Sequence, residues 1–318
     1  MIAPGEPSTV QIEVPEERGG ERADAVVAEI LGLSRTEAAA WLADGAVTHT
    51  TGRRSGQPVK KSEKLPPGAM LQATTPVRGD PLEVVEEIVE DLNLLHQDEH
   101  IVVVDKPVGV AAHPSPGWTG PTVVGGLLGL GVEITTSGAQ ERRGIVHRLD
   151  VGTSGVMVVA KTERGYTVLK DAFRSRTPSK VYHALVQGLP DPVDGTIDAP
   201  IGRHPGHDWR FAVLEAGREA RTHYRLMEAY GRVSLMEVRL ETGRTHQIRV
   251  HFAALGHPCA GDLTYGADPT LAARLGLTRQ WLHAYELGFT HPGTAEWVTF
   301  RSEHHEDLTE ALRIMEEQ

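Results

Sequence analysis

The spacing of apolar residues predicts two short helices near the start of the chain. The apolar residues of 26–31 follow a helical period that ends at Gly32. Ser34, with Glu37 three residues later, has the pattern of a capping box and predicts a second helix over 35–42. After a turn, short strands are predicted at 46–48 and 70–74. Two helices and a few strands predict a compact module.

Strand patterns dominate the rest of the chain. The run IVVVD at 101–105 is typical of a buried strand. Further strands are predicted at 155–161, 180–188, 220–230 and 233–241. Helices are predicted at 121–129, 162–176 and 244–256, the last with Ile248, Phe252 and Leu255 on its core-facing side. The pattern therefore predicts an α+β fold, in which a mixed, mostly antiparallel sheet is flanked by helices and loops.

Composition divides the chain into four predicted parts. Residues 1–16 are rich in Pro and Glu, which predicts a flexible tail. Residues 17–77 form the small module, and 78–92 are predicted to be an acidic linker. The larger domain is predicted over 93–318.

Charge and cysteine content narrow the function classes. The net charge is −11, which argues against a simple nucleic-acid binder. Residues 142–249 carry 18 Lys and Arg against 12 Asp and Glu, a net of +6 that leaves −17 for the remainder. Because charges are screened beyond about 10 Å, a polyanion such as RNA responds to a local basic surface and not to the net charge of the chain. However, basic and acidic side chains mixed on a solvated surface without a ligand would give the same counts. The chain has one cysteine, no charged leader and no long apolar run, so a cytoplasmic protein without disulfides or a membrane partner is expected.

Several familiar catalytic patterns are absent. His246 and His251 are five residues apart, whereas a zinc protease helix needs His at i and i+4 with a Glu between them. The segment GTSGV does not match the G-x-S-x-G elbow of serine hydrolases. A metal-dependent hydrolase would need clustered His, Asp and Glu ligands, and no such spacing is found. The sequence therefore predicts no metal site.

The stretch HRLDVGTSG at 147–155 allows two interpretations. Arg148 and Asp150 either form a buried ion pair that holds a turn, or Asp150 is a nucleophile and Arg148 holds its substrate. Arg249, next to a core-facing residue of its helix, is a candidate partner that would keep Asp150 ionised in a pocket. Tyr182, in a predicted strand, offers an aromatic face to a base. Taken singly, each of these residues is more often structural.

Together, five ordered motifs are more specific. They are KPVGVAAHPSPG (106–117), GIVHRLDVGTSGVMVVAKT (144–162), KVYHALVQG (180–188), ETGRTHQIRVHFAALGHPCAGD (241–262) and WLHAYELGFTHP (281–292). The chain resembles the RluA family of pseudouridine synthases, in the RluD-like branch that carries an N-terminal S4-like (αL-type) module. The strong part of the resemblance spans residues 93–292.

The resemblance implies an isomerase that converts uridines of RNA to pseudouridine without a cofactor or metal. Asp150 would attack the target uridine, at C1′ or C6, and Arg249 would pair with Asp150. Tyr182 would stack on the flipped uracil near the proton that leaves C5. Arg148 would fill the gap left by the extruded nucleotide, and Leu282 would line the pocket.

His147 is grouped with these substrate-binding residues, although a structural hydrogen bond to the loop is its expected role. The S4-like module is expected to contact RNA through Arg35, Arg53, Arg54, Lys60, Lys61 and Lys64. Arg35 is the only cation of the second predicted helix, where S4-like domains are usually basic, so the RNA contact is expected to shift toward 53–64.

The expected partner is RNA, with large-subunit ribosomal RNA as substrate by resemblance to the S4-bearing branch. No obligate protein partner is inferred, and a monomer is expected. Transfer RNA as the substrate, or a non-catalytic RNA-binding protein of the same fold, are the alternatives.

Overall fold

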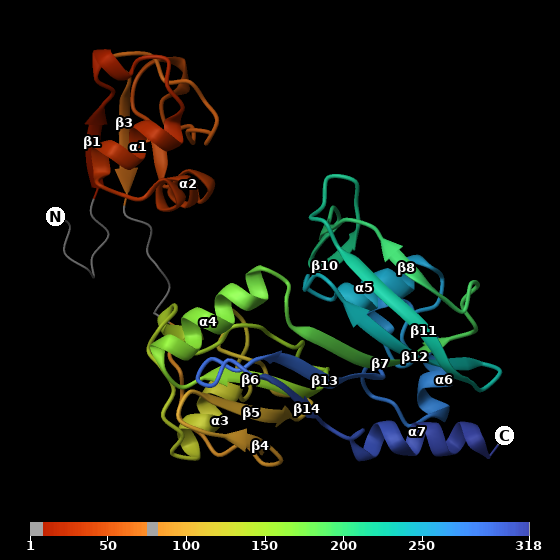
Figure 1. The fold of residues 1–318 in the computed structure, drawn as a ribbon. Helices are drawn as coiled ribbons and strands as arrows, with labels where there is room; N and C mark the ends of the chain where they lie inside the picture. Colours follow the sequence, from red (N-terminus) through yellow and green to blue (C-terminus); the bar gives the residue numbers. More distant parts are fainter. Residues whose placement is uncertain (1–8, 75–81, 318) are drawn as a thin grey trace. The chain divides into compact units, whose positions relative to one another are not determined.

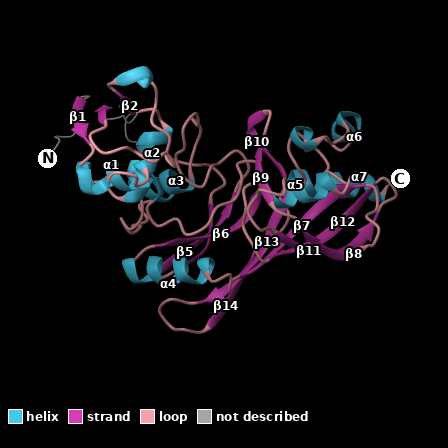
Figure 2. Ribbon diagram, turned by 90° about the horizontal axis from the view of Figure 1, so that it is seen from above, coloured by secondary structure: helices cyan, strands magenta, loops and turns pink. Residues whose placement is uncertain are grey.

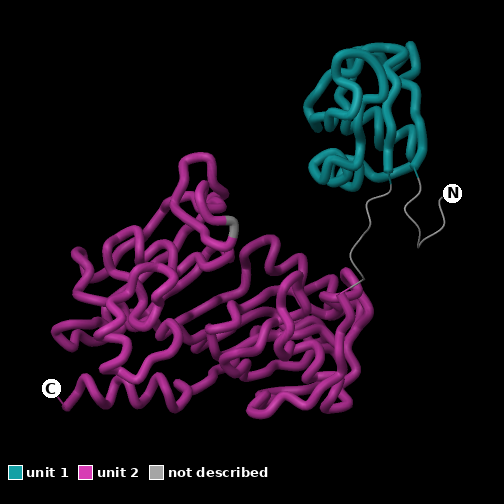
Figure 3. Tube along the Cα trace, turned by 180° about the vertical axis from the view of Figure 1, so that it is seen from behind, with its two compact units in different colours: residues 1–81 teal, residues 82–318 magenta. Residues whose placement is uncertain are grey.

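The computed structural model describes residues 9–74 and 82–317, and the chain divides into two compact units after residue 81 (Figure 3). Each unit has its own hydrophobic core. None of the described helices is long and apolar enough to cross a membrane.

The first unit is a three-stranded antiparallel sheet with two helices packed on it (Figure 1). The sheet has the order β1 (Thr9–Glu13), β3 (Met70–Thr74), β2 (Val47–His49), and the helices are α1 (Ala23–Leu31) and α2 (Arg35–Ala43). The predicted capping box is confirmed, because the Glu37 amide donates to Ser34 Oγ at 3.2 Å and the Ser34 amide donates to the Glu37 carboxylate at 3.0 Å.

The predicted flexible tail is wrong for residues 9–16. Residues 9–13 form β1, which pairs in register with β3, and Ile12 and Val14 are buried in the core of the unit. The alternation of apolar and polar residues in VQIEV is a strand signal that the Pro- and Glu-rich composition obscured. Residues 1–8 of the predicted tail lie outside the described residues.

A nine-stranded sheet forms the centre of the second unit, and it confirms the predicted mixed, mostly antiparallel arrangement. Its order is β4-β5-β6-β13-β7-β12-β11-β8, with β14 on β13, and β6 with β13 is the one parallel pair among the described strands. The strands are β4 (Asn93–Gln97), β5 (Ile101–Lys106), β6 (Ser154–Ala160), β7 (Ser179–Gln187), β8 (Asp194–Asp198), β11 (Arg221–Ala229), β12 (Val233–Leu240), β13 (Leu282–Thr290) and β14 (Trp297–Arg301). A separate hairpin consists of β9 (Ile201–His204) and β10 (His207–Val213).

Helices cover both faces of this sheet (Figures 1 and 2). Alternate residues of β5 and β6 pack on α3 (Val123–Gly129) on one face and on α4 (Glu163–Arg174) on the other. At the other end, β7 and β12 pack on α5 (Gln247–Ala254) on one face and on α6 (Pro269–Arg274) and α7 (Glu306–Glu316) on the other. Short 3-10 helices occur at Glu16–Arg18, Gly52–Arg54, Gln140–Arg142 and Leu263–Tyr265.

The helix predicted over 244–256 is shorter than expected. It begins at Gln247, because His246 has a left-handed backbone with φ of 56° that cannot continue a helix. Ile248 and Phe252 are buried as predicted, but Leu255 follows the last helical residue and is exposed.

Part of the predicted acidic linker packs on the second unit. Residues 78–81 lie outside the described residues, but Val89 and Leu92 are buried in the core beside α3. Two glycines of α3 make room for this segment: a Cβ at Gly125 would lie 2.3 Å from the Val85 carbonyl oxygen, and one at Gly129 would lie 2.1 Å from that of Glu87. The segment 82–92 is therefore packed against α3 despite its charge.

Candidate active site

The loop that precedes β6 carries the HRLD stretch. The Thr153 amide donates to the Asp150 carbonyl at 3.0 Å and closes a tight turn. Ser154 hydrogen-bonds the buried His283 ring of β13 at 2.9 Å. Gly155 has φ of 112°, and a Cβ there would lie 2.2 Å from the Ala284 carbonyl oxygen, so β6 and β13 approach too closely for any other residue. The loop is thus held against β13.

A cleft of about 510 Å³ opens beside this loop. The structure brings together at its lining five residues that the sequence singled out, namely His147, Arg148, Asp150, Tyr182 and Leu282. They come from the loop before β6, from β7 and from the first position of β13, and these strands are neighbours in the sheet.

The sixth predicted residue, Arg249 of α5, lies buried behind Asp150. Its Nη1 is 3.4 Å from Asp150 Oδ2, while its Nε and Nη2 donate to the two oxygens of Asp262 at 2.6 and 2.9 Å. Burial opposes the charged guanidinium, but the hydrogen bonds that it donates to Asp262 and the negative charges of Asp262 and Asp150 raise the pKa of Arg249. Arg249 therefore stays charged. It makes two short hydrogen bonds to Asp262 and one longer contact with Asp150.

Sequence reasoning missed Asp262 as a functional residue, although it ends one of the quoted motifs. Its side chain is only 1% exposed. A carboxylate that is buried without a partner is unfavourable. The only signal for Asp262 in the sequence was therefore weak: an Asp directly after a glycine in a mostly apolar stretch, which would need a buried cation nearby if it were buried.

His246 and Tyr265 complete the surroundings of Asp150. The Phe211 amide donates to the Tyr265 hydroxyl at 3.1 Å, and that hydroxyl lies 2.8 Å from His246 Nδ1. The Tyr265 hydroxyl then donates a hydrogen bond to Nδ1, which leaves the proton of the neutral ring on Nε2, 3.8 Å from Asp150 Oδ2. Burial and the neighbouring Arg side chains outweigh Asp150 and lower the pKa of His246. His246 thus presents an N–H toward Asp150 without a positive charge.

Tyr182 and Leu282 form an apolar part of the cleft. Leu282 is buried and pairs across the sheet with Ala184, two residues after Tyr182. Burial, with a smaller effect of Asp150, raises the pKa of Tyr182. Tyr182 is therefore a neutral phenol at physiological pH, with its ring beside Asp150.

Arg148 and His147 point to different surroundings although they are adjacent. Arg148 is exposed at the cleft, in a position to contact a substrate. His147 Nε2 accepts a hydrogen bond from the Val158 amide at 3.0 Å, and the ring stacks on Phe173 at 4.5 Å. Burial, assisted by Lys180, lowers the pKa of His147 to about 3. The structural hydrogen bond expected of His147 thus runs to β6 rather than to the loop.

Cations dominate the charge of the cleft lining. Six Lys or Arg side chains line it against two carboxylates, those of Asp150 and Glu241. The cations are Arg148, Lys170, Arg174, Arg176, Lys180 and Arg244. Burial and Arg176 lower the pKa of Lys180 to about 8. Two of these cations are paired with carboxylates outside the lining, Arg174 with Asp171 and Arg176 with Glu219, and the lining itself has more cations than carboxylates despite the negative net charge of the chain.

A fully buried lysine supports the loop from below. Lys106 Nζ donates to the carbonyls of Pro107 and Val110 at 2.8 Å and lies 3.4 Å from that of Val151, the residue after Asp150. Burial lowers the pKa of Lys106 to about 7. The motif that begins KPVG contained this residue, but its contact with the loop arises only in the fold.

The cations predicted to bind RNA in the first unit are all exposed, but they differ in pairing. Arg54 forms an ion pair with Glu63 at 2.6 Å, and Arg35 lies 3.5 Å from Asp24. The other predicted cations, Arg53, Lys60, Lys61 and Lys64, are exposed around the same loop and strand connection.

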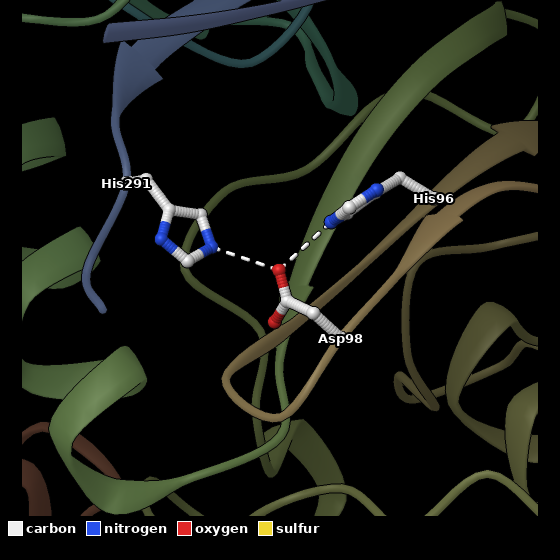
Figure 4. Close-up of side chains that lie close together, drawn as sticks. All are labelled: His96, Asp98 and His291. Carbon is white, nitrogen blue, oxygen red and sulfur yellow. Dashed lines mark hydrogen bonds and ion pairs between the residues drawn. The ribbon is translucent and has the colours of Figure 1, made fainter. Parts of the chain in front are cut away.

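One cluster in the second unit has the composition of a metal site (Figure 4). His96 and His291 each approach Asp98 Oδ2 through Nε2 at 2.8 Å. However, His291 Nδ1 accepts the amides of Gly293 and Thr294, both at 3.1 Å, so its proton lies on Nε2 and is donated to Asp98. Burial opposes ionisation, but hydrogen bonds from His96, from the amides of Ile101 and His100, and from His291 together hold the pKa of Asp98 far below its usual range. The chemistry fits a carboxylate that joins the β4–β5 turn to the end of β13 better than it fits a cation ligand.

Comparisons with known proteins agree on one family. The family described as RNA pseudouridylate synthase matches residues 100–254. A protein of Mycobacterium bovis described as an uncharacterized RNA pseudouridine synthase is 58% identical over 302 residues, which are 95% of this chain and 96% of that protein. Ribosomal large subunit pseudouridine synthase D of Nitrosomonas europaea is 38% identical over 97% of this chain and 88% of its own length. The solved structure of human RNA pseudouridylate synthase domain containing 1 is 28% identical, with a TM-score of 0.55, and covers 68% of this chain and 84% of its own.

Proposed function

The chain belongs to the RluA family of RNA pseudouridine synthases, and we propose that it isomerises uridines of large-subunit ribosomal RNA by means of Asp150, without a cofactor. The observation that carries the proposal is the arrangement of Asp150 in a cation-lined cleft, backed by a buried Arg249 that Asp262 holds in place.

The reaction requires one bond to be exchanged for another. The N1–C1′ bond of the target uridine breaks, a C5–C1′ bond forms, the proton on C5 leaves and N1 takes up a proton. Asp150 supplies the covalent attachment during the exchange, by attack at C1′ or C6. Arg249 Nη1 lies 3.4 Å from the Asp150 carboxylate, so a buried cation faces the proposed nucleophile.

The neighbouring side chains suit a flipped uracil. Tyr182 offers a neutral ring for stacking beside Asp150, and Leu282 provides an apolar wall. Exposed Arg148 is placed to enter the space that the extruded nucleotide leaves. The remaining cations of the lining suit the phosphates on either side of that nucleotide.

Ribosomal RNA as the substrate is supported by the names of two relatives. Ribosomal large subunit pseudouridine synthase D proteins of Nitrosomonas europaea and Neisseria meningitidis are each 38% identical over nearly the whole chain. We infer further that the first unit is an S4-like RNA-binding module, with exposed Arg53, Lys60, Lys61 and Lys64 as its contacts.

Mapping pseudouridine in total RNA tests the proposal. Cells that lack the protein should lose modification at specific large-subunit positions, and wild-type protein should restore it. Asp150→Asn should not restore it, because an amide cannot act as the anionic nucleophile. The matched control is Asp198→Asn, which changes an exposed carboxylate paired with Arg221. Lost sites confined to transfer RNA would overturn the ribosomal assignment, and activity of Asp150→Asn above about one part in a thousand would overturn the nucleophile.

A further inference from the structure

We propose that Arg279 is a positioning residue for the reaction. Its guanidinium holds the turn that carries Asp150 at a fixed distance from Leu282, the apolar wall of the cleft, and Asp307 of α7 holds that guanidinium in place. This inference rests on the proposed function, since it concerns the geometry of the same site.

Arg279 joins the two sides of the cleft from behind. It lies three residues before β13 and is only 7% exposed. Its Nη1 donates to the Gly152 carbonyl at 3.1 Å and to the Leu282 carbonyl at 3.3 Å. Gly152 is two residues after Asp150. One nitrogen therefore contacts both the turn of the proposed nucleophile and the backbone of the cleft wall.

Helix α7 orients the guanidinium. Arg279 Nε and Nη2 donate to the two oxygens of Asp307 at 2.7 and 2.9 Å, and such a bidentate pair fixes the plane of the group. Asp307 lies in the first turn of α7, whose Leu308 and Ala311 are buried in one core with Trp281. The Trp281 indole also donates to the Leu308 carbonyl at 2.9 Å. A packed helix thus aims Nη1 at the two carbonyls.

Other groups hold the remaining parts of the same turn. The Gly109 amide donates to the Val151 carbonyl at 3.0 Å, and Gln280 Nε2 donates to Thr153 Oγ1 at 3.3 Å. A Cβ at Gly152 would lie 2.6 Å from Gln280 Oε1, so the turn rests on that side chain. The guanidinium differs from both of these groups, because the nitrogen that holds the turn also reaches the cleft wall.

The distance between the turn and the wall matters for the rate. Reacting atoms have to lie about 3–3.5 Å apart, and a displacement of about 1 Å can slow a reaction about 100-fold. Arg279 is not among the described residues that line the cleft, so its replacement moves the turn without removing a contact to RNA. The expected signature is a slower reaction at unchanged RNA affinity.

Single-turnover conversion of an RNA stem-loop that contains the modified uridine tests the proposal. Arg279→Lys keeps a positive charge next to Asp307 but has no planar fork to reach the two carbonyls. The rate at saturating RNA should fall about 100-fold, while the RNA concentration for half-maximal rate should stay within about 2-fold of wild type. The matched control is Arg313→Gln, which breaks a bidentate but exposed pair with Glu310 on the same helix, at 2.6 and 2.7 Å.

A second variant separates positioning from stability. Asp307→Asn changes a side chain that is 38% exposed, so the variant should fold, and it removes the charge that orients the guanidinium. Its rate should fall in the same direction as that of Arg279→Lys but by less. Urea unfolding of each variant shows that the assay is done on folded protein. A purely structural role predicts wild-type rates whenever the variants are folded.

Hydrogen exchange measures the turn independently of turnover. The Thr153 amide donates to the Asp150 carbonyl, and both this amide and that of Gly109 should exchange faster in Arg279→Lys but not in Arg313→Gln. If wild-type protein made no pseudouridine, the proposed function would fail, and a wild-type exchange rate would still refute the hold of Arg279 on the turn. With active wild-type protein, either a wild-type rate at saturating RNA or wild-type exchange in folded Arg279→Lys would overturn the proposal.

Discussion

Asp262 provides the sharpest test of the charge arrangement at the active site. Both of its oxygens accept hydrogen bonds from Arg249, at 2.6 and 2.9 Å, and its side chain is 1% exposed. Asp262→Asn keeps the shape but removes the charge and turns an NH₂ group toward a guanidinium. Removal of one partner from a buried ion pair destabilises proteins by about 3–5 kcal/mol. We expect the lower end, about 3 kcal/mol, because Asp150 still offers partial compensation to Arg249.

The loss can be measured by urea unfolding. With a urea dependence of about 3 kcal/mol per molar for a unit of this size, the midpoint should fall by about 1 M. Asp150→Asn is the matched control: its pair with Arg249 is 3.4 Å long and the carboxylate is 16% exposed, so its midpoint should move far less. Both variants should lose turnover, Asp262→Asn because the Arg249 that orients Asp150 loses its anchor. Equal midpoints for Asp262→Asn, Asp150→Asn and wild type would refute this reasoning.

Three further predictions follow from the same contacts. Tyr182→Phe should bind RNA normally but slow turnover, whereas Tyr182→Ala should lose both properties; equal behaviour of the two variants in a single-turnover assay would contradict the stacking role. Burial lowers the pKa of His283 to about 3, so the unfolded chain takes up this proton first as the pH falls from 6.5 to 4.5, and stability should drop by about 2 kcal/mol from this group. His283→Gln should remove that part of the pH dependence in urea titrations at several pH values, and replacement of the half-buried His223 should not. Replacement of the first unit's exposed cations, Arg53, Arg54, Lys60, Lys61 and Lys64, by Gln should lower the salt dependence of binding to structured RNA by about 0.7–0.9 for each phosphate that is no longer bound, with Arg54 contributing least because Glu63 already pairs with it. Equal salt slopes for the five-residue variant and wild type would assign RNA binding to the second unit alone.

Local physics explains why many elements were predictable from the sequence. The capping box of Ser34 and Glu37 and the stop at Gly32 depend on neighbouring residues only, and both occur in the structure as predicted. The apolar run at the start of β5 predicts a strand that is buried on both faces, and the helical spacing of apolar residues in α4 predicts a helix that is buried on one face. Both predictions depend on the local pattern alone. Asp150 was singled out by its motif and lies in the cleft.

Where composition and pattern disagreed, composition misled. Residues 9–13 and 82–92 looked like a tail and a linker because of their Pro and acidic content. Yet β1 is held by pairing with β3. The segment 82–92 packs closely on α3, because Gly125 and Gly129 have no side chains that would exclude it. Such contacts join segments far apart in the chain, and no local preference encodes them.

The chain alone determined which residue types were available, including Asp150, Arg249 and the five ordered motifs. Tertiary structure decided what each of them contacts. Arg249 is 99 residues from Asp150 in sequence but contacts it, and Asp262 neutralises Arg249 more strongly than Asp150 does. The same folding turned His147 toward Val158 and placed Lys106 beneath the loop. The reason is that ion pairing and burial depend on the distances between side chains in space. Those distances cannot be read from positions along the chain, because they arise only when the whole chain has folded.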